Sequence, residues 1–316
     1  MAELKNDGGY HEPVLVDRVV ELLVTDRNGA YLDLTAGGGG HLQALAHSLS
    51  DRARLYGVDA DPVAVERTTK ALSQTVQFRN ILQTPFAEID RMAGQFAEDG
   101  FAGILIDLGL SSYQLDEPAR GFSYRYDAPL DMRFDRHSGE SAGELVNSLG
   151  EKQLERILRE FGEERQAARI ARAIVRERQT QMIATTAQLR DIVLAVVRPP
   201  HENKSLARVF QALRIAVNKE LEQIDRVLPA ALSLLTPGGR LAVIAYHSLE
   251  DRRIKRFFQQ EAKGRCTCPP GMPVCACGSG PSMKLVTRKP VLPDENEISR
   301  NPRARSARLR VAERLT

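Results

Sequence analysis

Hydrophobic and polar positions switch between strand and helix periods over the N-terminal third of the chain. Short apolar, partly β-branched runs predict strands at 30–35, 54–59, 76–82 and 104–108. Apolar residues at helical spacing predict helices at 14–24, 42–49 and 61–72, the last capped by Asp61-Pro62. Strands and helices in alternation are typical of βαβ units, so this pattern predicts a parallel sheet covered by helices.

A helical segment then interrupts the strand pattern. Residues 116–206 contain no strand-period run, whereas apolar residues recur at helical spacing, as at Ile170 and Ile174. We therefore expect an inserted all-helical domain at 117–206, with 1–116 plus 207–316 forming the sheet domain.

The strand pattern resumes in the last third. An amphipathic stretch over 209–235 ends at Thr236-Pro-Gly-Gly239 and leads into a predicted strand at 240–246. A helix near 251–260 follows. Alternating residues at 283–288 and 308–311 predict antiparallel strands that close the sheet. The expected fold is α/β, with a mostly parallel, doubly wound sheet.

Composition agrees with this fold class. The chain has 316 residues, of which 42% are hydrophobic and 27% charged, which excludes a wholly disordered or fibrous protein. Aromatic residues make up only 5% and Trp is missing, so the core must consist mainly of aliphatic side chains, as in helix-on-sheet layers.

Positive charge gathers at the C-terminal end. The formal net charge is only +3, but from Lys284 onward nine basic residues accompany four acidic ones, a local net charge of +5. Such a distribution fits a face that meets a polyanion, and it equally fits a solvated tail.

The chain shows no signal for export or membrane insertion. Its start carries Glu3, Lys5 and Asp7 without an apolar stretch, and no apolar run is long enough to cross a bilayer. We expect a cytoplasmic protein.

The four cysteines form one local cluster. Cys266, Cys268, Cys275 and Cys277 are unlike the dispersed cysteines of a disulfide framework. They could hold a Zn²⁺ ion, although structural zinc sites space their paired ligands further apart, so reduced loop thiols without a metal are the alternative.

A glycine-rich loop follows the first predicted strand. Thr35-Ala-Gly-Gly-Gly-Gly-His41 lies between a strand and a helix, where backbone can approach a ligand and helix N–H groups are free. The dinucleotide pattern G-x-G-x-x-G fails because Leu42 occupies the last position. Asp33, near the end of the first strand, and Asp59, at the end of the second, would repel a pyrophosphate but suit a cationic sulfonium and ribose hydroxyls. These residues favour S-adenosylmethionine over NAD.

A third acid, Asp107, ends the predicted central strand. Ligands of open α/β sheets bind outside the carboxyl ends of the strands, so Asp107 is expected to line the same cleft. Singly, each acid could also be a helix cap or part of a surface ion pair.

Several long motifs between Tyr10 and Arg314 have unusual compositions. They are Tyr10-His-Glu-Pro-Val-Leu, Gly37-Gly-Gly-Gly-His, Gly57-Val-Asp-Ala-Asp-Pro, Asp107-Leu-Gly-Leu-Ser-Ser-Tyr-Gln-Leu-Asp, Gly121-Phe-Ser-Tyr, Leu130-Asp-Met-Arg, Gly162-Glu-Glu-Arg, Phe210-Gln-Ala-Leu-Arg-Ile-Ala-Val-Asn, His247-Ser-Leu-Glu-Asp-Arg and Asn301-Pro-Arg-Ala-Arg-Ser-Ala-Arg-Leu-Arg. In this order they resemble the bacterial 16S ribosomal RNA cytosine-N4 methyltransferase family.

The resemblance implies a class I, Rossmann-like methyltransferase fold with an inserted helical domain that helps to engage RNA. It also implies S-adenosylmethionine as cofactor and N4 of a decoding-centre cytosine as acceptor, position 1402 in the usual rRNA numbering. The implied partner is 16S rRNA or the small ribosomal subunit, with no membrane partner, and a homodimer is allowed. The implied cofactor-binding residues are Gly39, Gly40, His41, Asp59, Phe86, Asp107 and Gln114.

The chain departs from the family pattern at a few positions. These are Leu42, Tyr113, Phe134, Tyr246 and the segment Lys204-Ser-Leu-Ala-Arg. They affect local contacts rather than the reaction.

Methylation of cytosine N4 needs an acceptor for the amine proton. Asp107, or a carbonyl of Leu108-Gly-Leu110, could fill that role. A flipped base would need a pocket wall, for which the candidates are Tyr113, Phe122, Tyr124, Tyr126, His247 and Ser248, although loop aromatics also serve ordinary packing.

A row of arginines marks the expected insertion. Arg165, Arg169, Arg172 and Arg176 recur at helical spacing and predict one basic face, which could contact phosphates. The alternative is pairing with the acids Glu160, Glu163 and Glu164.

Two other classes of function share parts of this pattern. A dinucleotide-dependent oxidoreductase has the same βαβ start, and a non-catalytic assembly factor could use the same RNA surface without turnover.

Overall fold

A computed structural model describes residues 13–96, 99–109, 117–136, 139–264 and 280–316. The chain divides into two compact units. The first, which we call the sheet unit, comprises Met1–Gly109 and Glu222–Thr316. The second, which we call the helical unit, is Leu110–Leu221. The sequence-based boundaries at 117 and 206 lie inside the helical unit.

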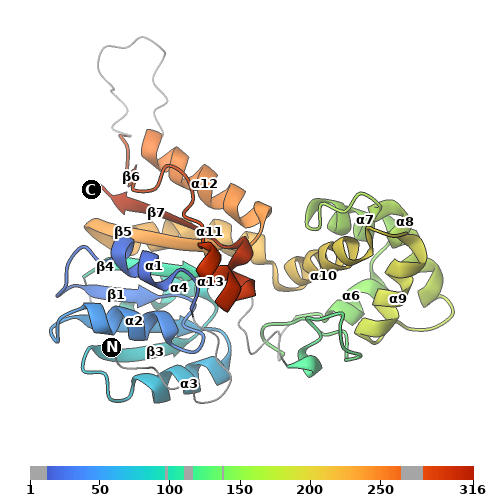
Figure 1. The fold of residues 1–316 in the computed structure, drawn as a ribbon, viewed down its shortest axis with the longest axis horizontal. Coiled ribbons are helices and arrows are strands. Elements are labelled where there is room, and N and C mark those ends of the chain that lie inside the picture. The colour runs from blue at the N-terminus through green and yellow to red at the C-terminus, as the bar shows by residue number, and fades with distance from the viewer. Residues whose placement is uncertain (1–12, 97–98, 110–116, 137–138, 265–279) are drawn as a thin grey trace, which may run out of the picture. The chain divides into compact units, whose positions relative to one another are not determined.

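Within the described residues, the sheet unit holds one seven-stranded sheet in the order β3-β2-β1-β4-β5-β7-β6 (Figure 1). The strands are β1 (Ala30–Asp33), β2 (Arg54–Asp59), β3 (Phe78–Gln83), β4 (Phe101–Asp107), β5 (Leu235–Ala245), β6 (Met283–Leu285) and β7 (Arg308–Arg314). Strands β1 to β5 pair in parallel, and β7 pairs antiparallel with both β5 and β6. The predicted mostly parallel α/β sheet with closing antiparallel strands is confirmed.

Helices cover this sheet. They are α1 (Val16–Leu23), α2 (Gly40–Ser48), α3 (Pro62–Leu72), α4 (Ile89–Met92), most of α11 (Glu220–Leu234), α12 (Ser248–Lys263) and α13 (Glu295–Arg300), with short 3₁₀ turns η1 (Phe86–Glu88), η2 (Ala93–Gln95) and η4 (Pro302–Ser306). Buried Leu23 and Leu42, from α1 and α2, pack with Leu105, Ile244 and Val311 of the sheet. This aliphatic layer fixes the strand ends that carry the candidate site.

Strand boundaries shift where side-chain burial and turns differ from the simple pattern. Val76 is exposed, so β3 starts at Phe78 rather than two residues earlier. The expected turn at 236–239 lies inside β5, where the pairing with β4 jumps from Phe101↔Leu235 to Gly103↔Arg240. The extra residues form a bulge, in which Gly238 has a φ of +80°.

The amphipathic stretch over 209–235 is not one helix. It is divided between α10 (Glu202–Asn218) and α11, because Lys219 adopts a left-handed φ of +50° and ends α10. The apolar periodicity runs through this break, which is why the pattern gave no sign of it.

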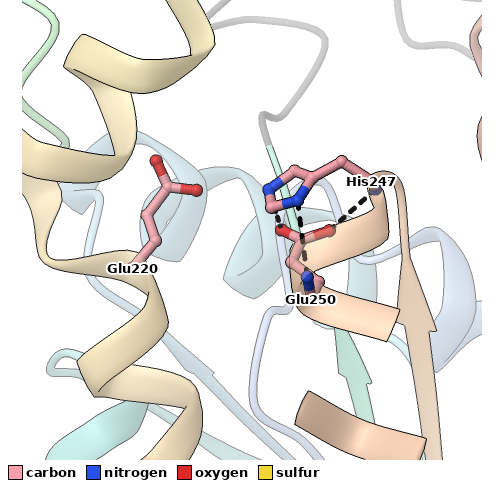
Figure 2. A group of neighbouring side chains, drawn as sticks. All are labelled: Glu220, His247 and Glu250. Carbon is pink, nitrogen blue, oxygen red and sulfur yellow. Dashed lines mark hydrogen bonds and ion pairs between the residues drawn. The ribbon is translucent and has the colours of Figure 1, made fainter. Parts of the chain in front are cut away.

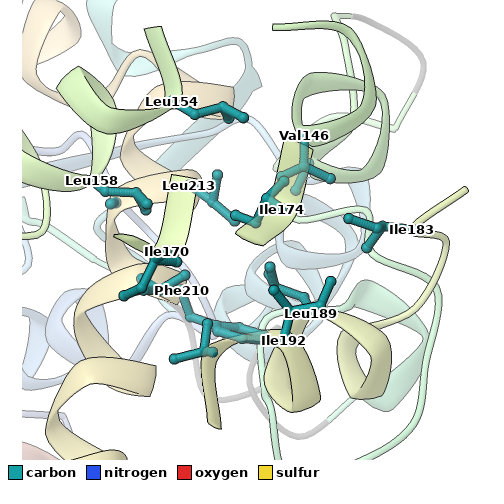
Figure 3. Close-up of a cluster of buried hydrophobic side chains, with 14 of the residues drawn as sticks. Val146, Leu154, Leu158, Ile170, Ile174, Ile183, Leu189, Ile192, Phe210 and Leu213 are labelled. Atoms are coloured by element: carbon teal, nitrogen blue, oxygen red, sulfur yellow. The ribbon is translucent and has the colours of Figure 1, made fainter. Parts of the chain in front are cut away.

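The helical unit is built from α6 (Ala142–Ser148), α7 (Glu151–Glu160), α8 (Ala167–Arg178), α9 (Thr186–Val196) and α10, with a 3₁₀ turn η3 (Pro118–Arg120). Its core is mainly aliphatic: Leu158, Ile170, Ile174 and Leu213 lie fully buried in one cluster (Figure 3). Ser141 and Glu144 form a capping box that begins α6. The helical unit therefore has a hydrophobic core of its own.

Candidate ligand site at the carboxyl edge of the sheet

Three acids end three parallel strands at one edge of the sheet. Asp33 ends β1, Asp59 ends β2 and Asp107 ends β4. In the strand register Asp33 is opposite Gly57 and Leu105, so β1 lies between the two strands that carry the other acids. The predicted gathering of these acids at one edge is thus borne out by the topology.

The glycine loop is held against this edge by β2 and α3. The Gly37 N–H donates to Asp59 Oδ2 at 2.8 Å, and the Gly37 carbonyl accepts from Thr68 Oγ1 at 3.0 Å. Gly37 and Gly39 have φ values of +55° and +82°, which a side chain would strain. The loop thereby presents Gly39 and Gly40 at the N-terminus of α2.

Asp59 is engaged through both carboxylate oxygens. Its second oxygen, Oδ1, accepts from the Asp61 N–H at 2.8 Å. Burial raises the pKa of Asp59 to about 6, and the charges of Asp61 and Asp33 act in the same direction against the two hydrogen bonds. Each oxygen keeps a further acceptor direction for a ligand hydroxyl.

Asp33 and Asp107 are joined through Thr35. Asp33 Oδ1 accepts from the Thr35 N–H and Oγ1, and Thr35 Oγ1 accepts from the Asp107 N–H at 2.6 Å. Asp33 is only 1% exposed, and its Oδ2 has no hydrogen-bond partner among the described residues. Burial raises the pKa of Asp33 above its ordinary value. A buried carboxylate oxygen without a partner is costly unless a donor or cation meets it.

His41 lies between the Val14 carbonyl and the Asp107 carboxylate. Its Nε2 lies 3.0 Å from the Val14 carbonyl, which can only accept, so Nε2 is the donor of this hydrogen bond. The other nitrogen, Nδ1, is 3.9 Å from Asp107 Oδ2.

Tyr246 binds the second oxygen of Asp107. The Tyr246 hydroxyl donates to Asp107 Oδ1 at 2.9 Å, linking the ends of β4 and β5. Burial raises the pKa of Asp107 to about 6 against the opposing effects of His41 and this hydrogen bond. Burial and the neighbouring Asp107 charge raise the Tyr246 pKa well above its ordinary value, so this phenol stays protonated and donating.

Glu250 caps the first turn of α12, directly after the end of β5. Its Oε2 accepts from the Tyr246 N–H at 2.8 Å and from the His247 N–H at 3.2 Å. The His247 ring lies over the Glu250 carboxylate, with Nε2 3.2 Å from Oε1 (Figure 2). Glu250 is 1% exposed, so it acts through its neighbours rather than on a ligand in solvent.

Phe86 follows β3 and begins η1, where it is half-buried rather than part of the core. Gln114, Tyr113 and the four cysteines Cys266, Cys268, Cys275 and Cys277 lie outside the described residues. The structure thus gathers Gly39, Gly40, His41, Asp59 and Asp107 around one loop and one sheet edge.

Of the aromatic wall candidates, one lies in the core of the helical unit and a second packs against that core. Phe122 is buried there, and Tyr124 packs edge-on against Phe210 with ring centroids 5.3 Å apart. Packing accounts for both rings, as the alternative reading allowed. Tyr126 is exposed, and Ser248 is exposed at the first position of α12.

The sequence did not predict that Thr35 would connect Asp33 to Asp107. Nor did it predict that Glu250 would accept hydrogen bonds from the Tyr246 and His247 N–H groups. Thr35 stands in the glycine motif, and Glu250 stands three residues after His247, the spacing of a capping box. This spacing is the sequence signal from which the capping role of Glu250 could have been predicted.

Not all basic residues near the C-terminal end are exposed to solvent. Arg310 is 7% exposed and pairs with Asp251, Nε to Oδ1, at 2.6 Å. The alternating pattern at 308–311 placed it on the polar face, but α12 covers that face and supplies the carboxylate.

Within the part of the chain that the structure describes, no helix is both long and apolar enough to cross a membrane.

Comparison with known proteins extends over nearly the whole chain. A profile of the MraW methylase family matches residues 9–315. Ribosomal RNA small subunit methyltransferase H of Heliobacterium modesticaldum is 46% identical over 310 residues, which cover 97% of this chain and 99% of that protein. The protein of the same name from Thermomicrobium roseum is 48% identical over 307 residues, 96% of this chain and 94% of that one. An rRNA methylase structure from Streptococcus thermophilus covers 95% of this chain and 94% of its own with a TM-score of 0.40 at 12% identity, a likeness too distant to inform the site.

Proposed function

The chain belongs to the MraW methylase family, and from this premise we propose which atom it methylates and which residues hold its cofactor. As a member it is an S-adenosylmethionine-dependent methyltransferase of the class I fold that acts on small-subunit ribosomal RNA. We propose that the acceptor is N4 of a decoding-centre cytosine in 16S rRNA, position 1402 in the usual numbering. The observation that most supports a cationic methyl donor is the group of three carboxylates, Asp33, Asp59 and Asp107, at the strand ends beside the glycine loop.

The residues at the sheet edge fit a cationic cofactor. Asp33 Oδ2 is buried without a partner, and ionised carboxylates at Asp59 and Asp107 add negative charge around the loop. A sulfonium and an ammonium would offset that charge, whereas a pyrophosphate would add to it. S-adenosylmethionine supplies an electrophilic methyl group when bound.

We assign the cofactor contacts to the residues of the loop and the strand ends. Gly39 and Gly40 offer backbone at the start of α2, Asp59 accepts from ribose hydroxyls, and the half-buried Phe86 offers a ring face to adenine. His41, Asp107 and Gln114 complete the proposed set.

Asp107 is the proposed acceptor for the amine proton. The cytosine N4 lone pair is delocalised into the ring, so a carboxylate that accepts from N4–H localises it toward the methyl group. With a pKa of about 6, Asp107 is mostly ionised at neutral pH. Tyr246 fixes Oδ1, which leaves Oδ2 to accept the amine proton.

Family membership removes the dinucleotide-dependent oxidoreductase and the non-catalytic assembly factor as rivals. The proposed cofactor site also lies at the carboxyl edge of the sheet, which is where ligands of open α/β sheets bind. A homodimer stays a prediction from the resemblance.

The test combines RNA analysis with cofactor binding. Small-subunit RNA from cells lacking this protein should lack one N4-methyl group at the decoding-centre cytosine by mass spectrometry, and the wild-type gene should restore it. Asp107→Ala should fail to restore it, while calorimetry on the purified variant measures S-adenosylmethionine binding separately. An unchanged methylation pattern in the deletion strain would refute the assigned target, and full restoration by Asp107→Ala would remove Asp107 from the chemistry.

A further inference from the structure

A groove on the sheet unit adjoins the candidate site. It has a volume of about 310 Å³ and is lined by Tyr246, His247, Ser248, Leu292, Arg305, Ser306, Ala307 and Arg308. This volume is at the lower end of the range for small-ligand pockets, roughly 300–1,000 Å³. The groove therefore has room for one nucleotide-sized group rather than for a folded domain.

The groove wall carries positive charge. Arg305 is exposed, and it makes no ion pair among the described residues. Arg308 is also exposed, with its side chain tied to Asp251, NH1 to Oδ2 at 3.3 Å. Asp251 is shared with the buried Arg310, so this trio keeps a net positive charge. Among the described residues, no carboxylate lines the groove.

The backbone that presents these arginines is firmly fixed. Ala304 and Ala307, on either side of Arg305 and Ser306, are fully buried. The Asn301 side chain accepts from the Arg303 N–H at 3.2 Å and so begins the turn η4. The Arg305 guanidinium thus extends from an ordered anchor, which lowers the entropy lost when it binds an anion.

One residue belongs to both the groove and the candidate site. Tyr246 lines the groove and donates to Asp107 Oδ1 at 2.9 Å. A chain that lies in the groove is therefore within one side chain of the carboxylate proposed to receive the amine proton. The exposed Leu292 adds an apolar contact at the groove wall, suited to a ribose or base face.

We propose that this groove binds the sugar-phosphate backbone of the substrate RNA beside the target cytosine, with Arg305 and Arg308 contacting phosphate oxygens. The proposal rests on the proposed function, since it assigns a strand path to the same RNA. Phosphate contacts of this kind position the nucleic acid, and contacts to the base itself select the target cytosine.

The test measures how binding of undermethylated small subunits, prepared from cells lacking this protein, depends on salt. Each lost phosphate contact should lower the slope of log Kd against log salt by about 0.7 for a single strand. Arg305→Ala should show that decrease, and Arg305→Glu should weaken binding further.

Arg52→Ala is the matched control. Arg52 is an exposed arginine in the turn before β2, at the opposite edge of the sheet from the strand ends, and should leave the slope unchanged. Calorimetry with S-adenosylmethionine confirms that each variant is folded. A wild-type slope in both Arg305 variants overturns the groove assignment. A wild-type protein that binds the cofactor but transfers no methyl group to these subunits overturns the proposed function instead, and one that does not bind the subunits overturns both.

Discussion

Two carboxylates at the site are held in an unfavourable ionised state. Burial raises the pKa of both Asp59 and Asp107 to about 6 from an ordinary value near 4. A raised carboxyl pKa means that the folded protein binds the proton more tightly than the unfolded chain does. The stability cost of these charges is therefore absent at low pH and grows as the pH rises through the window from about 4 to 6. A cationic ligand would relieve that cost.

The Asp107→Asn variant tests how the buried negative charge of Asp107 affects both turnover and stability. Turnover should fall by about 10² or more, on the scale of a lost general base, while the amide keeps an oxygen for the Tyr246 hydroxyl. Without ligand, the melting temperature should rise by a few degrees, because a shift of about two pKa units corresponds to up to roughly 3 kcal/mol. Turnover and thermal unfolding are measured on the same preparation.

The pH profile gives the second readout for Asp107. Wild-type turnover should decline as the pH falls through about 6, where Asp107 takes up a proton. Asp90→Asn, at an exposed position, serves as the control and should keep the wild-type profile. If Asp107→Asn retains both wild-type turnover and the acidic decline, another group accepts the proton.

At the scale of single elements, the loop before α2 depends on backbone that only glycine adopts readily. Gly39→Ala should destabilise the fold by about 1–2 kcal/mol because Gly39 has a φ of +82°. Its new Cβ would also lie 3.4 Å from Thr68 Cγ2, and we expect weaker S-adenosylmethionine binding by calorimetry. Gly94→Ala is the control, since a Cβ there meets nothing within 4 Å. Equal cofactor affinity in the two variants would contradict the role of the loop.

The elements show what sequence could and could not reveal. Alternating strand and helix periods located β1, β2, α2 and α3 because their apolar faces are covered in the usual way. Nothing in the sequence indicated that the helix ends at Lys219, because one left-handed residue does not disturb the apolar period on either side. Asp33, Asp59 and Asp107 were found because each ends a parallel strand. Their links through Thr35 and Tyr246 depend on contacts between distant parts of the chain, which periodicity does not record.

At the scale of the whole molecule, the helical unit carries basic residues of its own. Arg165 precedes α8, so the expected helical row consists of Arg169, Arg172 and Arg176. Arg172 lies 3.5 Å from Glu151, which was not among the expected partners. Glu160 instead pairs with Arg156, and Glu164 lies 4.0 Å from Arg208. Within the described ranges, Arg165 and Arg176 have no acidic partner.

Removing Arg165, Arg169 and Arg176 together by Ala substitution should weaken binding of undermethylated small subunits. The salt slope should decrease by about 0.7 for each phosphate contact that is lost. Arg156→Ala with Arg159→Ala is the control, because both arginines pair with glutamates on their own helix. An unchanged slope in the triple variant would mean that this face is only solvated.

The crossover from β4 to β5 has a consequence for synthesis on the ribosome. Strand β4 ends at Asp107 and its parallel neighbour begins only at Leu235, so the half-sheet β3-β2-β1-β4 keeps a bare hydrogen-bonding edge while the intervening residues are translated. We expect the helical unit to fold during this interval, and the nascent chain to depend on chaperones until β5 arrives. The enzyme would then be inert until late in translation, since Tyr246 meets Asp107 only after that strand has docked.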